Sequence, residues 1–268
     1  MSAFDGKVTG PDLLAMKKQG RPITMLTAYD ASFARLVDGA GVDCVLVGDS
    51  LGNVIQGLDS TLPVSIEDMV YHTRAVRRGV DRAMLIADLP FLTYHDRASA
   101  VTSAGMLMRA GAEMIKLEGG GDMAERVREL TGLGIPVCGH LGLTPQHVHR
   151  LGGYRVQGRE AKAANALMAD ASALEQAGAG VLVLECVPAE LAAGIARQLQ
   201  IPVIGIGAGP DVDGQVLVLY DALGLSPGHR PRFVRDFLAG AGSVDAALEA
   251  FVRSVHEGSF PSAEESYS

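Results

Sequence analysis

Six ionisable side chains stand at the ends of five short apolar runs in the sequence. They are Asp49 after the run 44–48, Asp88 at the end of 84–88, Lys116 and Glu118 within 114–118, His140 at the end of 137–140 and Glu185 at the end of 181–185. If these runs are parallel strands of one barrel, their carboxyl ends lie on one face and the side chains meet there. Any one of them alone is as readily a structural residue, but six at successive strand ends predict a functional site.

Three of these side chains offer the oxygen ligands of a metal ion. Asp49, Asp88 and Glu118 place carboxylates on three neighbouring runs. Hard oxygen ligands with positions left for water and substrate suit Mg²⁺, and the spacings typical of Zn²⁺ sites are absent from the sequence. Each aspartate also has a structural alternative, since Asp49 competes with Ser50 to cap a helix and Asp88 precedes a turn at Pro90. We predict a magnesium site at Asp49, Asp88 and Glu118.

The remaining side chains have the types needed for proton transfer and charge stabilisation. Lys116 and Glu118 are two residues apart in an extended run, so they point to the same side, where they bind a ligand or form a structural pair. Glu185 ends an apolar run, where a desolvated carboxylate serves as a general base; a salt bridge across the barrel mouth is the alternative. His140 alone is equally a hydrogen-bonded core histidine.

The elements that position these residues alternate between short runs of Val, Ile and Leu and longer stretches with helical spacing. We predict eight strands, at 22–27, 44–48, 84–88, 114–118, 137–140, 181–185, 203–207 and 216–220. Strands that are apolar on both faces are typical of a parallel sheet covered by helices. Eight such units in 268 residues favour a single-domain (β/α)8 TIM barrel over a doubly wound open sheet or two small domains.

No linker divides the chain, so residues 1–268 are predicted to form one domain. A short N-terminal helical pattern begins at Gly10-Pro11-Asp12 and ends at Gly20. The stretch 142–158 is long, polar and glycine-rich, and lies before a helix near 161–177; loops of this kind are often functional. The segment 259–268 is predicted to be weakly ordered or docked on a neighbouring subunit.

Composition narrows the class of partner and the compartment. The net charge of −8 and the pI near 5.3 argue against nucleic-acid or anionic-membrane partners. The cysteines, Cys44, Cys138 and Cys186, lie in apolar runs without metal-type spacing, which suits a reducing compartment. We expect no signal peptide, because the first twenty residues are polar and charged, and no membrane span, because no apolar run approaches the ~18 residues required. A soluble cytoplasmic protein is therefore predicted.

Seven segments of the sequence resemble the ketopantoate hydroxymethyltransferase family. They are VGDSLG (47–52), DSTLPV (59–64), ADLPF (87–91), KLEGG (116–120), GHLGLTPQ (139–146), LECVP (184–188) and IGIGAG (204–209). The resemblance runs in order from about Asp12 to about Pro261. Two departures are minor: Leu58 stands where a Tyr or His is common in the family, and the N-terminus is slightly longer.

The resemblance implies a (β/α)8 barrel that holds one Mg²⁺ per subunit and uses 5,10-methylenetetrahydrofolate as co-substrate. The implied reaction transfers a hydroxymethyl group to 3-methyl-2-oxobutanoate and gives 2-dehydropantoate, the first step of pantothenate biosynthesis. Carried over residue by residue, the metal positions are Asp49, Asp88 and Glu118, the oxo-acid contacts are Asp49, Ser50, Asp88 and Lys116, the catalytic base is Glu185, and His140 lies near the substrate. Family members are usually homodecamers.

Two rival interpretations remain at this point. One is a magnesium-dependent oxo-acid lyase or mutase of the phosphoenolpyruvate mutase and isocitrate lyase group, which shares enolate chemistry. The segment GHLGLTPQ and the lack of a catalytic cysteine loop at the fifth strand disfavour it. The other is a non-enzymatic binding protein that has kept the fold, which the intact ionisable residues at five strand ends argue against.

Overall fold

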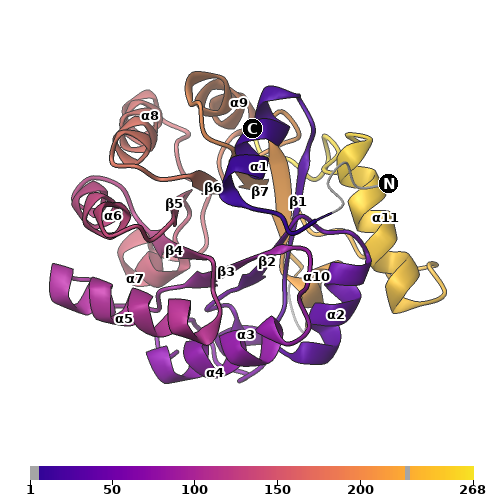
Figure 1. Ribbon diagram of the computed structural model, residues 1–268. Coiled ribbons are helices and arrows are strands. Elements are labelled where there is room, and N and C mark those ends of the chain that lie inside the picture. The colour runs from indigo at the N-terminus through magenta and orange to yellow at the C-terminus, as the bar shows by residue number, and fades with distance from the viewer. Residues whose placement is uncertain (1–5, 227–229) are drawn as a thin grey trace.

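Eight parallel strands close into one barrel in the computed structural model, which describes residues 6–226 and 230–268 (Figure 1). The strands are β1 Ile23–Thr27, β2 Cys44–Val47, β3 Met84–Asp88, β4 Met114–Glu118, β5 Val137–Gly142, β6 Val181–Glu185, β7 Val203–Ile206 and β8 Gly214–Leu217. Each strand pairs with the next along the chain, and β8 pairs with β1. The predicted single-domain TIM barrel is confirmed.

Helices surround the barrel and cover the outer face of its strands (Figure 1). They are α1 Gly10–Lys18, α2 Ala31–Gly39, α3 Leu51–Val54, α4 Ile66–Arg77, α5 Arg97–Ala110, α6 Met123–Gly132, α7 Val148–Leu151, α8 Ala161–Gln176, α9 Ala189–Gln198, α10 Leu219–Ala222 and α11 Val244–His256, with a 3₁₀ turn at Pro145–His147. Local capping sets several starts: Ser65 and Asp68 exchange backbone and side-chain hydrogen bonds at the start of α4. Across the described residues, none of these helices combines the length and apolar character needed to cross a bilayer.

The eighth predicted strand was wrong in its bounds. The structure has β8 at Gly214–Leu217, and the end of the predicted run, Leu219 and Tyr220, belongs to the short helix α10. A continuous apolar run does not distinguish a buried strand from a buried helical turn. The strand also starts earlier because a side chain at Gly214 would lie 2.3 Å from the carbonyl oxygen of Ile23, so only glycine fits beside β1.

The C-terminal segment packs against its own chain, although we expected weak order or docking on a neighbouring subunit. Phe260 is buried and contacts the ring of Phe237 edge-on. Arg235 donates two hydrogen bonds to the carboxylate of Glu265, at 2.8 and 2.6 Å. The backbone N–H of Ala189 in α9 donates to the carbonyl of Tyr267 at 2.9 Å. The tail therefore ends at the carboxyl side of the barrel.

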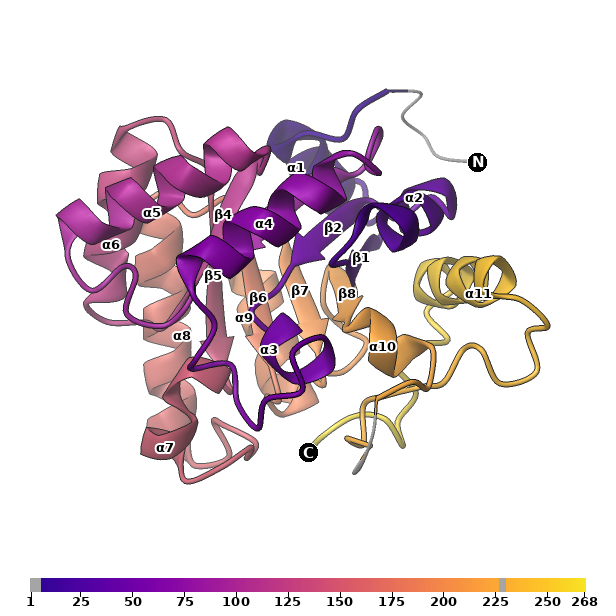
Figure 2. The same ribbon diagram turned by 90° about the horizontal axis from the view of Figure 1, so that it is seen from below.

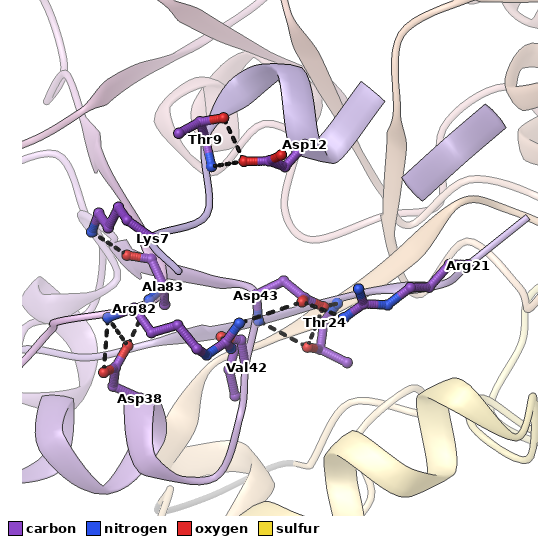
Figure 3. Close-up of polar contacts among 10 residues, drawn as sticks. All are labelled: Lys7, Thr9, Asp12, Arg21, Thr24, Asp38, Val42, Asp43, Arg82 and Ala83. Atoms are coloured by element: carbon purple, nitrogen blue, oxygen red, sulfur yellow. Dashed lines mark hydrogen bonds and ion pairs between the residues drawn. The ribbon is translucent and has the colours of Figure 1, made fainter. Parts of the chain in front are cut away.

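A buried polar cluster holds the opposite end, where the strands begin (Figure 3). Asp43, which precedes β2, is fully buried and accepts hydrogen bonds from the backbone N–H and the hydroxyl of Thr24, at 3.0 and 2.9 Å. Arg21 lies 3.0 Å from the other carboxylate oxygen. The cluster joins the entry to β1 with the entry to β2, so its role is stability.

Asp43→Ala is expected to lower the free energy of unfolding by ~3–5 kcal/mol, because it removes a fully buried carboxylate that pairs with the half-buried Arg21 and accepts two hydrogen bonds from Thr24. The matched control is Asp81→Ala, since Asp81 is exposed in the same part of the fold. Denaturant unfolding followed by circular dichroism measures both variants. A loss below ~1 kcal/mol in Asp43→Ala, the range of an exposed ion pair, would contradict this role.

Candidate active site

The carboxyl ends of the strands open into a cavity of about 770 Å³. In Figure 2 this end of the barrel carries α3, α7 and α10, opposite α1. All seven residues singled out from the sequence line the cavity: Asp49, Ser50, Asp88, Lys116, Glu118, His140 and Glu185. Strand ends that are far apart in the sequence are thus brought into one site.

Lys116 and Asp88 form a buried ion pair inside this cavity. The register of β3 and β4 places the two residues directly opposite each other, and the Lys116 Nζ lies 2.9 Å from Asp88 Oδ1. Burial alone lowers the pKa of Lys116, but the carboxylates of Asp88, Glu118 and Asp49 outweigh it and raise that pKa above its usual range. The lysine is therefore a fixed positive charge at neutral pH.

Asp49 lies next to this pair with little compensating charge of its own. Its backbone N–H donates to Asp88 Oδ2 at 3.1 Å, so the Asp88 carboxylate lies against the Asp49 backbone. Burial first, and then the charges of Glu118 and Asp88, raise the pKa of Asp49 to about 8. Burial also raises the pKa of Asp88, in spite of Lys116. The acidic side chains thus outnumber the cations around them, a setting that a bound cation would stabilise.

His140 lies between two glutamates from neighbouring strands. Its Nδ1 is 3.3 Å from Glu118 Oε1, and its Nε2 is 3.3 Å from Glu185 Oε2. Burial and Lys116 lower the pKa of His140, but the two carboxylates outweigh them and raise it to about 9. The imidazolium thus bridges the interior of the site to Glu185, the most exposed carboxylate of the group.

The three carboxylates that we predicted as metal ligands do not form a preassembled set. Within residues 6–226 and 230–268, no group of three His, Cys, Asp or Glu side chains is arranged to hold one metal ion. Lys116 pairs with Asp88, and His140 faces Glu118. Mg²⁺ usually takes only one or two protein carboxylates and completes its octahedron with water and substrate oxygens. Asp49 and Asp88 provide such an all-oxygen pair, and on chemistry they fit the ion.

Sequence reasoning missed several residues that line or brace the cavity. Tyr154 stands at its mouth from the loop after α7, which the glycine-rich pattern had marked as functional. Tyr267 reaches the cavity from the C-terminal tail, where no sequence signal indicated a role. Tyr29 contacts Ser50 through a hydroxyl–hydroxyl hydrogen bond of 2.8 Å. Gln146 is buried beside the carboxylates and lies in a segment whose role was left unassigned.

A family model and two curated relatives match this chain over nearly its whole length, and all three carry the name of the same enzyme family. A sequence model of the family ketopantoate hydroxymethyltransferase matches residues 7–263. A protein of Shewanella loihica named 3-methyl-2-oxobutanoate hydroxymethyltransferase is 55% identical over 262 residues, which cover 98% of this chain and 99% of that protein. A protein of the same name from Alkalilimnicola ehrlichii is 57% identical over 261 residues, covering 97% of this chain and 94% of its own.

Solved structures resemble the chain in fold. A putative phosphonomutase from Burkholderia cenocepacia superposes with a TM-score of 0.64 at 18% identity, covering 80% of this chain and 94% of that one. Phosphonopyruvate hydrolase in complex with oxalate and Mg²⁺ gives a TM-score of 0.61 at 16% identity, covering 96% and 92%. At such identities the likeness is one of architecture and carries no activity with it.

Proposed function

Because the chain belongs to the ketopantoate hydroxymethyltransferase family, we propose that its cavity joins 3-methyl-2-oxobutanoate to a one-carbon unit from 5,10-methylenetetrahydrofolate with the help of Mg²⁺. Hydroxymethyl transfer is the activity of this family, and its product is 2-dehydropantoate. The observation that carries the proposal is the gathering of one lysine, one histidine and four carboxylates in a single cavity at the carboxyl ends of β2 to β6. No second function is proposed, since the phosphonopyruvate enzymes share only the fold.

The reaction requires removal of a weakly acidic proton from C3 of the oxo acid. Glu185 is the proposed base, because its side chain is 15% exposed, whereas those of Asp88 and Glu118 are 4% and 1% exposed. His140 Nε2 lies 3.3 Å from the Glu185 carboxylate and forms an ion pair with it. A base held in this way contributes a rate factor of typically ~10²–10⁴.

The developing negative charge on the substrate needs stabilisation inside the cavity. Mg²⁺ held by Asp49 and Asp88, with Glu118 nearby, would act as a Lewis acid toward the ketone and carboxylate oxygens. Lys116 adds a fixed positive charge on the same side, and Ser50 with Asp49 binds the polar end of the substrate. The carbon nucleophile then forms a C–C bond to the methylene carbon of the donor, both bonds from that carbon to the folate nitrogens break, and one water molecule supplies the hydroxyl group. The proton taken from C3 and the second proton of the water end on the two nitrogens of the departing tetrahydrofolate. Holding both reactants in one cavity lowers the barrier by up to ~7–11 kcal/mol.

Three further proposals rest on the family resemblance. They are assembly into a homodecamer, a place in the cytoplasm, and action at the first step of pantothenate biosynthesis. Small molecules are the proposed partners, with no role for nucleic acid or membrane.

An omission series tests the proposed function. Purified protein is incubated with 3-methyl-2-oxobutanoate, and 5,10-methylenetetrahydrofolate or Mg²⁺ is left out in turn. Ketopantoate is expected only in the complete mixture, and a chelator should abolish its formation. Undiminished product after exhaustive removal of divalent cations would refute the metal, and product without the folate would refute the donor.

Tyr267→Ala is expected to lower kcat/KM for the oxo acid by about tenfold, through a higher KM, because loss of an apolar wall group costs a pocket ~1–3 kcal/mol. The ring lines the cavity and meets Phe233 edge-on, so its removal opens the wall beside Cys186. Tyr71→Ala, which removes a tyrosine that is 71% exposed on α4, is the matched control. Steady-state kinetics with equal KM values for the two variants would contradict a role for the tail in the pocket.

A further inference from the structure

One buried amide joins two of the acidic side chains of the site. Gln146 lies in the 3₁₀ turn after β5 and is 3% exposed. Its side-chain Nε2 donates to Asp49 Oδ2 at 2.8 Å, and its backbone N–H donates to Glu118 Oε2 at 3.0 Å. A single residue therefore binds one oxygen of each carboxylate. It lies in the loop after β5, whereas the two carboxylates lie at the ends of β2 and β4.

The surroundings of Gln146 determine which way its amide points. The carbonyl oxygen of Leu89 can only accept, and it lies 2.9 Å from the amide nitrogen. On the other side, the Tyr94 hydroxyl donates to Gln146 Oε1 at 2.5 Å. The backbone N–H of Glu118 donates to the same hydroxyl oxygen at 3.4 Å, and the Glu118 carbonyl is a second acceptor for the phenol proton at 3.4 Å. Gln146 Oε1, at 2.5 Å, is by far the nearer acceptor. Burial and the charge of Glu118 raise the pKa of Tyr94, which keeps that proton in place.

This arrangement has a consequence for the neighbouring carboxylates. Asp49, Asp88 and Glu118 repel one another, and Lys116 balances the group mainly through Asp88. Without the amide, Asp49 would be free to rotate away from its neighbours. With the amide donating to Oδ2, Asp49 is held in one rotamer, and Oδ1 is the oxygen left for another partner. A glutamate at position 146 would instead set an acceptor oxygen, in place of the donor nitrogen, against Asp49 Oδ2 and the Leu89 carbonyl.

We propose that Gln146 is a positioning residue of the cation site, which holds Asp49 and Glu118 in register, and that Tyr94 fixes the direction of its amide. The inference rests on the proposed function, because it takes Asp49 as a ligand of Mg²⁺. Residues that donate a hydrogen bond to a metal ligand without contacting the metal themselves typically contribute ~10–100-fold to metal affinity, and we expect this range for Gln146.

Calorimetric titration of Mg²⁺ into the full-length protein tests the proposal without any substrate. Gln146→Met, which keeps the length of the side chain but removes the amide, should weaken Mg²⁺ binding ~10–100-fold. Tyr94→Phe should weaken it several-fold, because the amide remains and Leu89 still orients it. The matched control is Gln215→Met in β8, since Gln215 is 4% exposed and its amide bonds only the Gly209 carbonyl among the contacts in the described residues.

The melting temperature without Mg²⁺ separates packing from positioning. Gln146→Met and Gln215→Met are both expected to melt earlier, but only the first should lose Mg²⁺ affinity. Wild-type Mg²⁺ affinity in Gln146→Met, together with weakened Mg²⁺ binding in Asp49→Asn, would overturn the proposed role of Gln146 and leave the cation site in place. Wild-type affinity in Asp49→Asn would remove the cation site and this inference with it. If Gln146→Met does not fold, wild-type affinity in Tyr94→Phe is the result that overturns the proposal.

Discussion

Glu185→Gln is expected to slow exchange of the C3 proton of 3-methyl-2-oxobutanoate with deuterated water by ~10²–10⁴-fold, the usual contribution of a general base. Glutamine keeps the size of the side chain and a hydrogen bond to the substrate, but it cannot accept the proton. Substrate binding should therefore persist while exchange is lost. Proton NMR of the C3 signal over time measures the rate without turnover of the folate.

The matched control for this variant is Glu190→Gln, which changes an exposed carboxylate at the start of α9. It should exchange the proton at the wild-type rate. The wild-type protein is measured with and without tetrahydrofolate, since deprotonation can require the donor site to be filled. Wild-type exchange in Glu185→Gln under both conditions would show that another group is the base, and His140 would be the first candidate.

Asp49→Asn and Asp88→Asn are each expected to lower turnover by about 100-fold or more and to weaken Mg²⁺ binding. The bound cation supplies several kcal/mol of charge stabilisation, and each ~1.4 kcal/mol is a factor of ten in rate. Activity is followed together with calorimetric titration of Mg²⁺. Unchanged Mg²⁺ affinity in both variants would remove Asp49 and Asp88 as ligands.

The same two variants should differ in stability when Mg²⁺ is absent. The pKa of Asp49 is raised to about 8 in the folded protein, so the fold keeps a proton on Asp49 that the unfolded chain releases, and stability falls as pH rises from the unfolded pKa toward 8. Asp49→Asn removes this titration and should melt no earlier than wild type at neutral pH. Asp88→Asn removes the partner of Lys116, 2.9 Å away, and should melt earlier. Equal melting temperatures for the two variants would contradict this electrostatic picture.

The barrel is readily predicted from the sequence because its strands are buried on both faces. The bounds of β3, β4 and β6 agree with the predicted runs 84–88, 114–118 and 181–185 at both ends. The same signal failed at β8, where the apolar run continues into α10. Periodicity reports burial, and the residues on both sides of that junction are buried.

The candidate site is predictable in its location and only partly in its arrangement. Strand order places Asp49, Asp88 and Glu185 at one end, since polar residues at strand ends gather at the carboxyl face of a barrel. The pairing of Asp88 with Lys116 depends on strand register, which the apolar pattern does not give. Gln146 and Tyr267 reach the site through a loop and the chain terminus, where local sequence says little about tertiary contacts.

The most direct test of the central claim follows the carbon that is transferred. The protein is incubated with 3-methyl-2-oxobutanoate, Mg²⁺ and tetrahydrofolate that carries a ¹³C-labelled methylene bridge, and the product is identified by mass spectrometry and NMR. We predict ketopantoate labelled only at its hydroxymethyl carbon, in an amount equal to the tetrahydrofolate released. Recovery of unlabelled oxo acid and intact donor after prolonged incubation of folded, Mg²⁺-loaded protein would contradict the proposed reaction.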